Sequence, residues 1–342
     1  MNGFNLISSA IILWNKRIGV SMPTSSLTAS SIAHIYDINL IYARQILNSI
    51  GQDGKIEDAK KFIYPRPKPF VKWAGGKRQL LKQFRDLGLY PPEEFDPITN
   101  MYYEPFVGGG AVFFDLLPKR AVLSDINKEL VITYNVIKNN VEELITLLKK
   151  HVYDNAYYLK IRSQNVNNLS DLEIASRFIY LNRTGFNGLY RVNKKGEFNV
   201  PFGRYINPVI CDEDNLRRVS AVLQNITITN QDYREAVKSA KAGDFIYLDP
   251  PYYPISPTSS FTAYTAEKFL EKEQIELRNL FIELNRRGCY VMLSNSDTTF
   301  IHSLYSGIEG VMINKINASR AINSKSSSRG KINELLIINY KI

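Results

Sequence analysis

The stretch that most constrains this chain is the apolar run 246–248 followed by Asp249-Pro250-Pro251-Tyr252. Proline cannot continue a central strand, so a strand is expected to end here and to place Asp249 at its carboxyl end. In open α/β sheets, ligands bind at that rim. The sequence therefore predicts an α/β domain with a site at the end of this strand.

The four residues Asp249, Pro250, Pro251 and Tyr252 suit the alkylation of a weakly nucleophilic planar amino group. If the Asp249 carboxylate and the Pro250 carbonyl each accept one amine hydrogen, the nitrogen lone pair is drawn toward tetrahedral geometry and toward an electrophilic methyl group. Two prolines hold that carbonyl rigidly, and Tyr252 offers a ring on which a base can stack. A proline pair alone is more often an ordinary turn, so the flanking acid and ring carry the interpretation.

Two upstream segments predict a small-molecule pocket. Residues 69–77 place Trp73 and Lys77 around two glycines, which combines an aromatic wall, close backbone approach and a cation. Residues 102–110 read as a strand that enters a glycine triplet, and a helix over 111–117 and a strand over 121–124 complete a Rossmann-like half. Asp125 follows that strand, where an acid suits ribose hydroxyls. A dinucleotide-binding enzyme is the alternative, but the triplet lacks the further glycine of the dinucleotide fingerprint.

Residues 183–204 read as a β-hairpin, because apolar and polar residues alternate on either side of Lys194-Lys195-Gly196. This stretch holds five Arg or Lys and one acid. Such a hairpin suits phosphate contacts and base-edge readout, although a charged hairpin in solvent is the alternative from composition alone. Helical patterns over 127–150, 156–164 and 171–182 predict an inserted helical domain before it.

The remaining pattern completes the sheet. Strands are expected over 226–229, 243–248, 290–294, 311–316 and 335–340, with a long helix over 266–287. The polar loop 319–331 contains Arg320, Lys325, Arg329 and Lys331, and is expected to be either disordered by itself or a second phosphate-contacting arm.

Composition limits the class of protein. The chain has 342 residues, 44% hydrophobic and 22% charged, which fits a soluble catalytic core with one or two smaller units, and its net charge of +10 points to a polyanionic partner. Cys211 and Cys289 have neither disulfide nor metal spacing, so we expect buried free thiols, no metal and a reducing cytoplasm. The apolar run 6–13 is too short to span a bilayer and precedes Lys16-Arg17, so neither a membrane segment nor a signal peptide is expected.

Residues 1–64 form an extension that matches no motif. Apolar spacing between residues 32 and 50 suggests two short helices, the second carrying Arg44, which would make either a helix-turn-helix or a helical cap. Pro65, Pro67 and Pro69 then form a stiff linker.

Together, residues 69–341 resemble the DNA adenine methyltransferase (Dam) family. The hairpin carries the strongest match, through Asn187-Gly188-Leu189, Arg191, Asn193 and residues 198–204, and the segments 73–77, 260–264 and 294–298 match as well. The resemblance implies transfer of the methyl group of S-adenosylmethionine to N6 of adenine in double-stranded DNA, within GATC or a related site, after base flipping. It implies an enzyme of the prokaryotic cytoplasm or nucleoid without an obligate protein partner.

The resemblance also implies roles for single residues. Cofactor contacts are expected from Trp73, Lys77, Glu104, Phe106, Gly108, Gly110, Asp125, Asp232 and Asp249. DNA contacts are expected from Arg183, Phe186, Asn187, Leu189, Arg191, Asn193, Pro201 and Arg204. Arg191 would read guanine, Leu189 and Pro201 would pack against neighbouring bases, and Arg183 would clamp a phosphate. Phe186 and Asn187 would fill the space left by the flipped adenine, although the family carries Tyr where Phe186 stands.

The expected architecture is a Rossmann-like, mostly parallel twisted sheet with an inserted helical and hairpin target-recognition domain. The boundaries are residues 1–64 for the extension, 65–126 and 225–342 for the catalytic domain, and 127–224 for target recognition. Three alternatives stay open. A cytosine N4 methyltransferase usually carries Ser or Thr at Asp249, and a ribosomal-RNA or protein-glutamine methyltransferase more often carries Asn. A catalytically idle DNA-binding regulator is the third.

Overall fold

The structure is a computed structural model that describes residues 66–193, 195–255, 269–319 and 331–341, without the side chains of 318, 319, 331 and 332. All described residues belong to the compact unit Arg66–Ile342. The predictions for residues 1–64, for the segment 260–264 and for Lys194, Arg320, Lys325 and Arg329 therefore lie outside the described residues.

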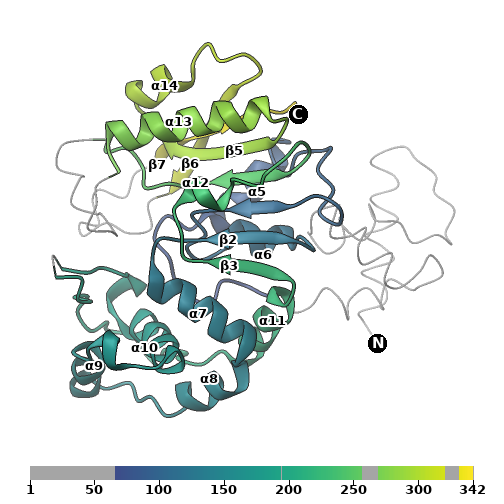
Figure 1. The fold of residues 1–342 in the computed structure, drawn as a ribbon. Helices are drawn as coiled ribbons and strands as arrows, with labels where there is room; N and C mark the ends of the chain where they lie inside the picture. The colour runs from purple at the N-terminus through teal and green to yellow at the C-terminus, as the bar shows by residue number, and fades with distance from the viewer. Residues whose placement is uncertain (1–65, 194, 256–268, 320–330, 342) are drawn as a thin grey trace, which may run out of the picture. The chain divides into compact units, whose positions relative to one another are not determined.

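One sheet organises the described residues (Figure 1). Its seven strands lie in the order β3-β2-β1-β4-β5-β7-β6. Their bounds are β1 Tyr102–Glu104, β2 Ala121–Ser124, β3 Ile226–Thr229, β4 Phe245–Leu248, β5 Tyr290–Ser296, β6 Met312–Ser319 and β7 Lys331–Ile338. The pairs among β3, β2, β1, β4 and β5 are parallel, whereas β7 runs antiparallel to both β5 and β6. The predicted Rossmann-like, mostly parallel sheet is confirmed.

The central strand β4 is buried on both faces, as its uninterrupted apolar sequence predicts. Because side chains alternate across a strand, Phe245 and Tyr247 join one hydrophobic cluster, and Ile246 and Leu248 join another. These two clusters are the cores on opposite faces of the sheet. The strand stops at Leu248, so Asp249 and Pro250 follow it directly, as predicted.

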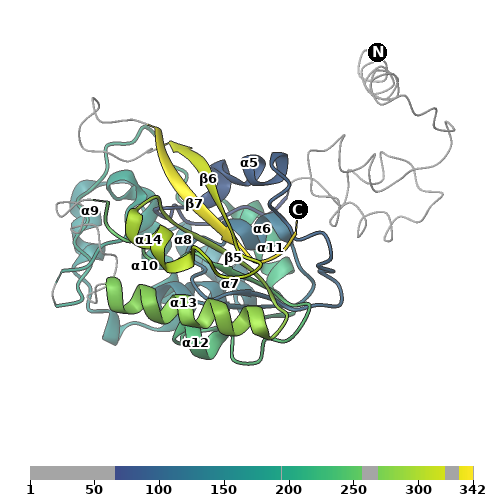
Figure 2. The ribbon, with the colours of Figure 1, turned by 90° about the horizontal axis from the view of Figure 1, so that it is seen from above.

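Helices cover both faces. The helices are α5 Leu81–Asp86, α6 Ala111–Leu116, α7 Lys128–Asn139, α8 Val141–Leu148, α9 Asn155–Arg162, α10 Asp171–Thr184, α11 Glu213–Leu223, α12 Tyr233–Ala236, α13 Glu271–Arg286 and α14 Thr299–Tyr305, with short 3₁₀ turns at η1 Lys77–Gln79, η2 Val166–Asn168 and η3 Phe186–Gly188. Figure 2 shows α12 and α13 on one side of the sheet and α5 and α6 on the other. In Figure 1, α8, α9 and α10 lie together below β3 and α7.

The insertion between β2 and β3 differs from the prediction in two places. The single helix expected over 127–150 is two helices, because the backbone leaves the helical region at Asn140, which ends α7 and begins α8. In the described residues 183–193 and 195–204, the predicted hairpin forms no continuous strand. It is held by isolated antiparallel bridges between Val192 and Phe198 and between Gly185 and Phe202.

Several elements escaped the sequence analysis. Helices α5, α11 and α14 were not predicted, and β5 extends to Ser296 rather than stopping at Ser294. Cys289 is a buried free thiol as expected, but Cys211 is only half-buried, so that part of the prediction is wrong. Within the described ranges, no helix is long and apolar enough to cross a membrane, and no group of three or more His, Cys, Asp or Glu could hold a metal ion.

Candidate active site

The site lies where the sheet reverses its winding. Strands β1 and β4 are parallel neighbours, yet the chain proceeds from β1 toward β2 and from β4 toward β5. The connections therefore leave the two carboxyl ends in opposite directions, and α/β sheets bind ligands in the crevice outside the strand ends at such a switch point. Glu104 ends β1 and Asp249 follows β4, so this topology brings two separate sequence motifs together.

Lys77 and Asp249 form an ion pair at this edge. Nζ of Lys77 lies 2.8 Å from Oδ1 of Asp249, and only 3% of the Lys77 side chain is exposed, compared with 20% of Asp249. The ammonium also donates to the Gly75 carbonyl and lies 4.9 Å from the centroid of the Tyr252 ring. Burial raises the pKa of Asp249 to about 6, although Lys77 opposes the rise. The Trp73–Lys77 motif thus reaches the Asp249–Tyr252 turn.

The glycine loop after β1 is packed too tightly to carry side chains. The Gly108 N–H donates to Oδ2 of Asp125 at 3.0 Å, and the hydroxyl of Tyr134 donates to the Gly108 carbonyl at 3.1 Å. A Cβ at Gly108, whose φ is +47°, would stand 2.5 Å from Cδ1 of Trp73. The loop backbone therefore lies directly against the Trp73 ring and the tip of β2, which joins three of the predicted cofactor residues.

Trp73 connects this loop to the inserted segment. Its ring stacks on Tyr190 at 5.8 Å and on Phe178 at 6.2 Å between centroids. Asn182 of α10 adds a second connection, since its side chain pairs with both the N–H and the carbonyl of Lys72 and also donates to the Gly188 carbonyl. The proposed cofactor wall and the hairpin are therefore one packed unit.

Glu104 is buried at the end of β1. Its Oε2 accepts hydrogen bonds from the Tyr102 hydroxyl at 2.9 Å and the Phe113 N–H at 3.0 Å. Burial raises the pKa of Glu104 to about 8. These partners hold the carboxyl group between β1 and the start of α6, next to the crevice.

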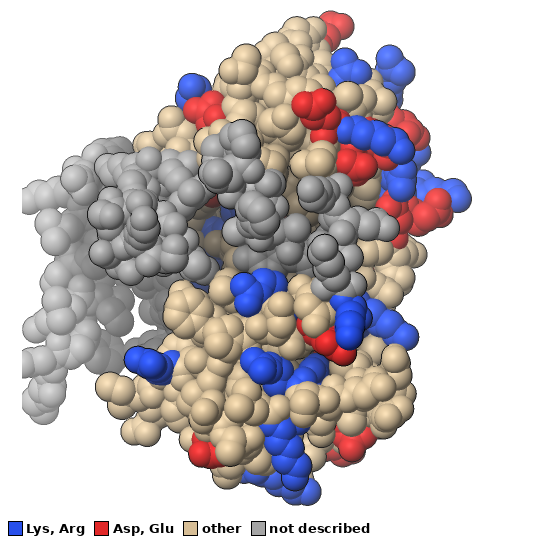
Figure 3. Space-filling view, turned by 90° about the vertical axis from the view of Figure 1, so that its left-hand side faces the viewer, with Lys and Arg blue, Asp and Glu red and all other residues tan. Residues whose placement is uncertain are grey.

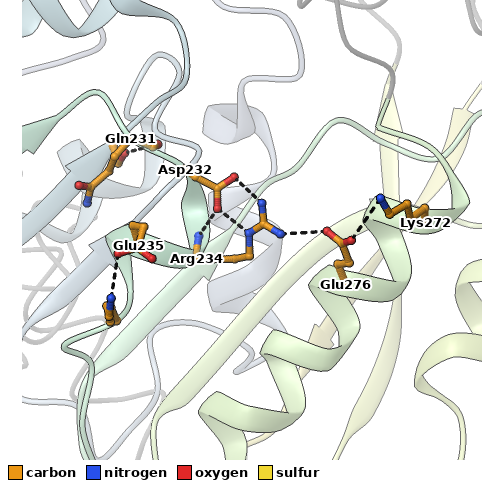
Figure 4. A network of polar contacts seen from close by, with 8 residues as sticks. Gln231, Asp232, Arg234, Glu235, Lys272 and Glu276 are labelled. Carbon is orange, nitrogen blue, oxygen red and sulfur yellow. Dashed lines mark hydrogen bonds and ion pairs between the residues drawn. The ribbon is translucent and has the colours of Figure 1, made fainter.

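Asp232 and Phe106 lie on the β3 side of the crevice. Asp232 caps α12 and faces the fork of Arg234, which also pairs with Glu276 of α13 (Figure 4). Burial raises the pKa of Asp232, but the hydrogen bonds from Arg234 outweigh it and leave the pKa below its usual value. Phe106 stacks on Tyr233 at 5.2 Å between centroids.

Glu334 is a site residue that sequence reasoning missed. The Tyr252 hydroxyl donates to Oε2 of Glu334 at 2.8 Å, and Glu334 lies on β7 opposite Ser296 of β5. An acid at the start of an apolar run was the available signal. Glu334 reaches Tyr252 because β7 inserts beside β5, and the residue pattern alone does not predict that strand order.

The hairpin segment presents its predicted DNA contacts on the surface. Arg191 and Pro201 are exposed, Leu189 is half-buried, and 48% of Phe186 is exposed. Nε of Arg191 donates to Oδ1 of Asn199 at 2.7 Å, so the guanidinium is oriented before any ligand arrives. In Figure 3, Lys and Arg predominate over the lower half of this face, whereas both signs of charge mix in the upper half.

The four other predicted DNA residues have different surroundings. Asn187 has a φ of +54°, and the side chain of Asn193 closes the hairpin tip by accepting from the Lys195 and Glu197 N–H groups. Arg204 is exposed. Arg183, in contrast, is half-buried and donates to the Phe70 carbonyl at 2.7 Å. One N–H donor of its guanidinium is therefore bound to a backbone carbonyl inside the protein.

Comparison with known proteins identifies this arrangement. Residues 73–322 match the family model of D12 class N6 adenine-specific DNA methyltransferases. The chain belongs to this family. It is 47% identical over 281 residues to the Type II methyltransferase M1.LlaDCHI of Lactococcus lactis subsp. cremoris, covering 80% of this chain and 95% of that protein.

Other relatives agree. The Type II methyltransferase M.MjaIII of Methanocaldococcus jannaschii is 44% identical over 291 residues, covering 80% of this chain and 99% of the relative. The DNA adenine methylase of Escherichia coli K12 is 33% identical over 276 residues, covering 80% and 95%. The chain is therefore an adenine-specific DNA methyltransferase, and the cytosine, RNA, protein-glutamine and idle-regulator alternatives are set aside.

Proposed function

We propose that this methyltransferase transfers the methyl group of S-adenosylmethionine to N6 of adenine flipped out of double-stranded DNA, within GATC or a related site. The observation that carries the proposal is the meeting of Asp249, Lys77 and the glycine loop at the switch point between β1 and β4. The resemblance of the hairpin to the Dam family supports the choice of site.

The residues around the glycine loop fit S-adenosylmethionine. Side chains at Gly108 and Gly110 would collide with Trp73 and Tyr134, so the loop offers bare backbone to a ligand. Each carboxylate oxygen of Asp125 accepts one backbone N–H, from Gly108 and from Asn127, which leaves further lone pairs for ribose hydroxyls. Phe106 and the exposed edge of Asp232 would face the adenine of the cofactor. When bound, S-adenosylmethionine supplies an electrophilic sulfonium methyl group.

Asp249 and Pro250 would activate the target amine. The Asp249 carboxylate and the Pro250 carbonyl each accept one amine hydrogen, which localises the nitrogen lone pair and aims it at the methyl group. Pro250 is buried and follows β4 directly, so its carbonyl needs little reorganisation as charge develops on the amine. Lys77 holds the carboxylate in place and favours its ionised form, which is the form that accepts hydrogen bonds. Water removes the amine proton after transfer.

Tyr252 would stack on the flipped base. Its hydroxyl is fixed by Glu334, which limits rotation of the ring. A base that leaves the duplex loses a few kcal/mol of stacking and pairing energy, about the amount that protein contacts must replace. Ring stacking in the site and the insertion of Phe186 and Asn187 into the vacated space would supply part of it.

Residues 127–224 would recognise the site, with α8 to α10 as scaffold and the hairpin as reader. Arg191 would contact the two major-groove acceptors of guanine, Leu189 and Pro201 would pack on neighbouring bases, and Asn193 and Arg204 would contact the backbone. We further propose that the enzyme acts in a reducing prokaryotic cytoplasm, where both free thiols are stable.

The test measures transfer of labelled methyl groups from S-adenosylmethionine to matched duplexes that contain GATC, GTTC or no adenine. Sequencing that detects N6-methyladenine in DNA from expressing cells then defines the site. We expect label only on adenine-containing duplexes, with the highest rate on GATC. Equal labelling of all duplexes, or label on cytosine, would contradict the proposal.

A further inference from the structure

Two buried amides hold the backbone of the catalytic turn from beneath. Gln274 of α13 and Asn295 of β5 are both 0% exposed. Nε2 of Gln274 donates to the Pro251 carbonyl at 3.0 Å, and Oδ1 of Asn295 accepts from the Tyr253 N–H at 3.1 Å. Nδ2 of Asn295 donates to Oε1 of Gln274 at 2.9 Å, which closes the chain. The two amides therefore hydrogen-bond to the backbone on both sides of Tyr252.

The direction of this hydrogen-bond relay is fixed by its ends. The Pro251 carbonyl can only accept and the Tyr253 N–H can only donate. Gln274 must therefore direct its Nε2 toward the Pro251 carbonyl, and Asn295 must direct its Oδ1 toward the Tyr253 N–H. The Nδ2 of Asn295 then faces the Oε1 of Gln274. Only this orientation satisfies every group, so reversing the polarity of either amide breaks the relay.

The location of these amides also argues against a packing role alone. Leu277, Leu293 and Ile337 belong to the same apolar core, where burying an amide is unfavourable unless it is hydrogen-bonded. Both amides hydrogen-bond to the turn, and Oδ1 of Asn295 also accepts from the Ser296 N–H of its own strand at 2.9 Å. Ser296 adds a third contact, since its hydroxyl donates to the Tyr253 carbonyl at 2.7 Å.

We propose that Gln274 and Asn295 are positioning residues for methyl transfer, which fix the turn so that the Pro250 carbonyl and the Tyr252 ring meet the target base in the reactive geometry. This inference rests on the proposed role of the Asp249–Tyr252 turn. A displacement of about 1 Å in a reacting group can lower a rate by about 100-fold. The pair Gln274 and Asn295, called the clamp below, can therefore control kcat without touching the reacting atoms.

The first variant is Gln274→Leu, which keeps side-chain bulk and removes both hydrogen bonds. At saturating DNA and S-adenosylmethionine, we expect kcat to fall by about 10- to 100-fold, while KM for each substrate stays within about twofold. The control is Asn285→Leu. Asn285 lies on the same helix, roughly 16 Å along its axis from Gln274. Its side-chain oxygen accepts a hydrogen bond at 2.8 Å from Asn339, which follows β7. The control should lower thermal stability without changing kcat.

The second variant, Asn295→Asp, keeps the acceptor for Tyr253 and removes the donor to Gln274. Gln274 then turns its nitrogen toward the carboxylate and its oxygen toward the Pro251 carbonyl, which repels it. We expect a loss of kcat similar to that of Gln274→Leu, and a double variant no slower than either single one, because the residues act as one relay. This variant carries the test if Gln274→Leu does not fold.

The outcomes separate the clamp from the proposed chemistry. If Asp249→Ala is as active as the unmodified enzyme, the turn is not catalytic and the proposed function fails. If Asp249→Ala is inactive while the folded Gln274 and Asn295 variants keep full kcat, the clamp is wrong. The clamp is also wrong if losses in the double variant multiply, or if Asn285→Leu loses the same kcat.

Discussion

The ammonium of Lys77 lies 2.8 Å from Oδ1 of Asp249, although the two residues are 172 positions apart in the chain. Lys77 is almost fully buried, so this ion pair is screened little by solvent. The pair joins the segment that opens the core to the turn after β4. It also decides whether Asp249 is ionised, and therefore whether it can accept hydrogen bonds from an amine.

Asp249→Ala should abolish most methyl transfer while the protein folds and binds DNA. Removing one such acceptor of the developing charge typically costs about 100- to 1000-fold in rate. The measurement is the single-turnover rate of methyl transfer, with DNA affinity from fluorescence anisotropy as the control. Robust turnover by the variant would contradict the role of Asp249.

Methyl transfer should slow as pH falls through about 6, the raised pKa of Asp249. A protonated carboxyl group is a poorer hydrogen-bond acceptor for the target amine than a carboxylate is. The titratable groups around Asp249 are Lys77, Glu334 and Glu104, and Glu104 is largely protonated near pH 6 because its own pKa is raised to about 8. Lys77→Met should move the acidic limb of the kcat profile to higher pH, since Lys77 lowers the Asp249 pKa. Glu334→Gln should move it to lower pH, since Glu334 raises that pKa. A flat profile between about pH 5 and about pH 8 would show that no ionisation of Asp249 near pH 6 controls methyl transfer.

Glu334→Ala should slow methyl transfer as much as Tyr252→Phe does, because each removes the same hydrogen bond at 2.8 Å. We expect a decrease of about 10- to 100-fold, equivalent to about 1.5 to 3 kcal/mol for a hydrogen bond to a charged group. Measured at pH values above the acidic limb, Glu334→Gln should restore most of the rate, since its amide oxygen still accepts. If losses in the double variant Tyr252→Phe with Glu334→Ala multiply, the two residues act separately.

Gly108→Ala should weaken cofactor binding, because its Cβ would stand 2.5 Å from Cδ1 of Trp73 and the backbone φ is +47°. We expect affinity for S-adenosylhomocysteine to fall by at least about tenfold in calorimetry, which corresponds to about 1.4 kcal/mol. Gly307→Ala is the matched control, since Gly307 has a φ of +78° with nothing within 4 Å of a Cβ. If Gly307→Ala loses as much affinity for S-adenosylhomocysteine as Gly108→Ala does, the loss comes from backbone strain and not from the contact with Trp73.

Arg191→Ala should reduce methylation of the true site much more than methylation of sites altered at the guanine it reads. One lost bidentate contact is worth about 1 to 3 kcal/mol of discrimination. Arg204→Ala is the control, because a phosphate contact should weaken all duplexes about equally and lower the salt dependence. Arg183 does not serve here, since its guanidinium donates to the Phe70 carbonyl. A common reduction across all duplexes with Arg191→Ala would show that Arg191 reads no base.

The sequence by itself determined the elements that depend on neighbouring residues. An apolar run that meets two prolines must be a strand that ends, and a glycine triplet between a strand and a helix must be a bare backbone loop. These local rules predicted β1, β2, β3 and β4 and placed Asp125 and Asp249 at strand ends. These rules failed at Asn140, where α7 ends and α8 begins. The apolar spacing continues across this break, so the pattern of one long helix and the pattern of two short helices look the same in the sequence.

Only the tertiary structure decided which distant side chains meet at the site. Glu334 reaches Tyr252 because β7 inserts antiparallel between β5 and β6, and Gln274 reaches Pro251 because α13 packs under the turn. Arg183 lies in the last turn of α10 and donates to the Phe70 carbonyl, although the sequence pattern assigned it to the hairpin. The periodicity of a segment specifies which of its faces is buried, but a hydrogen-bond partner is fixed by strand order and helix packing, which depend on the whole chain at once.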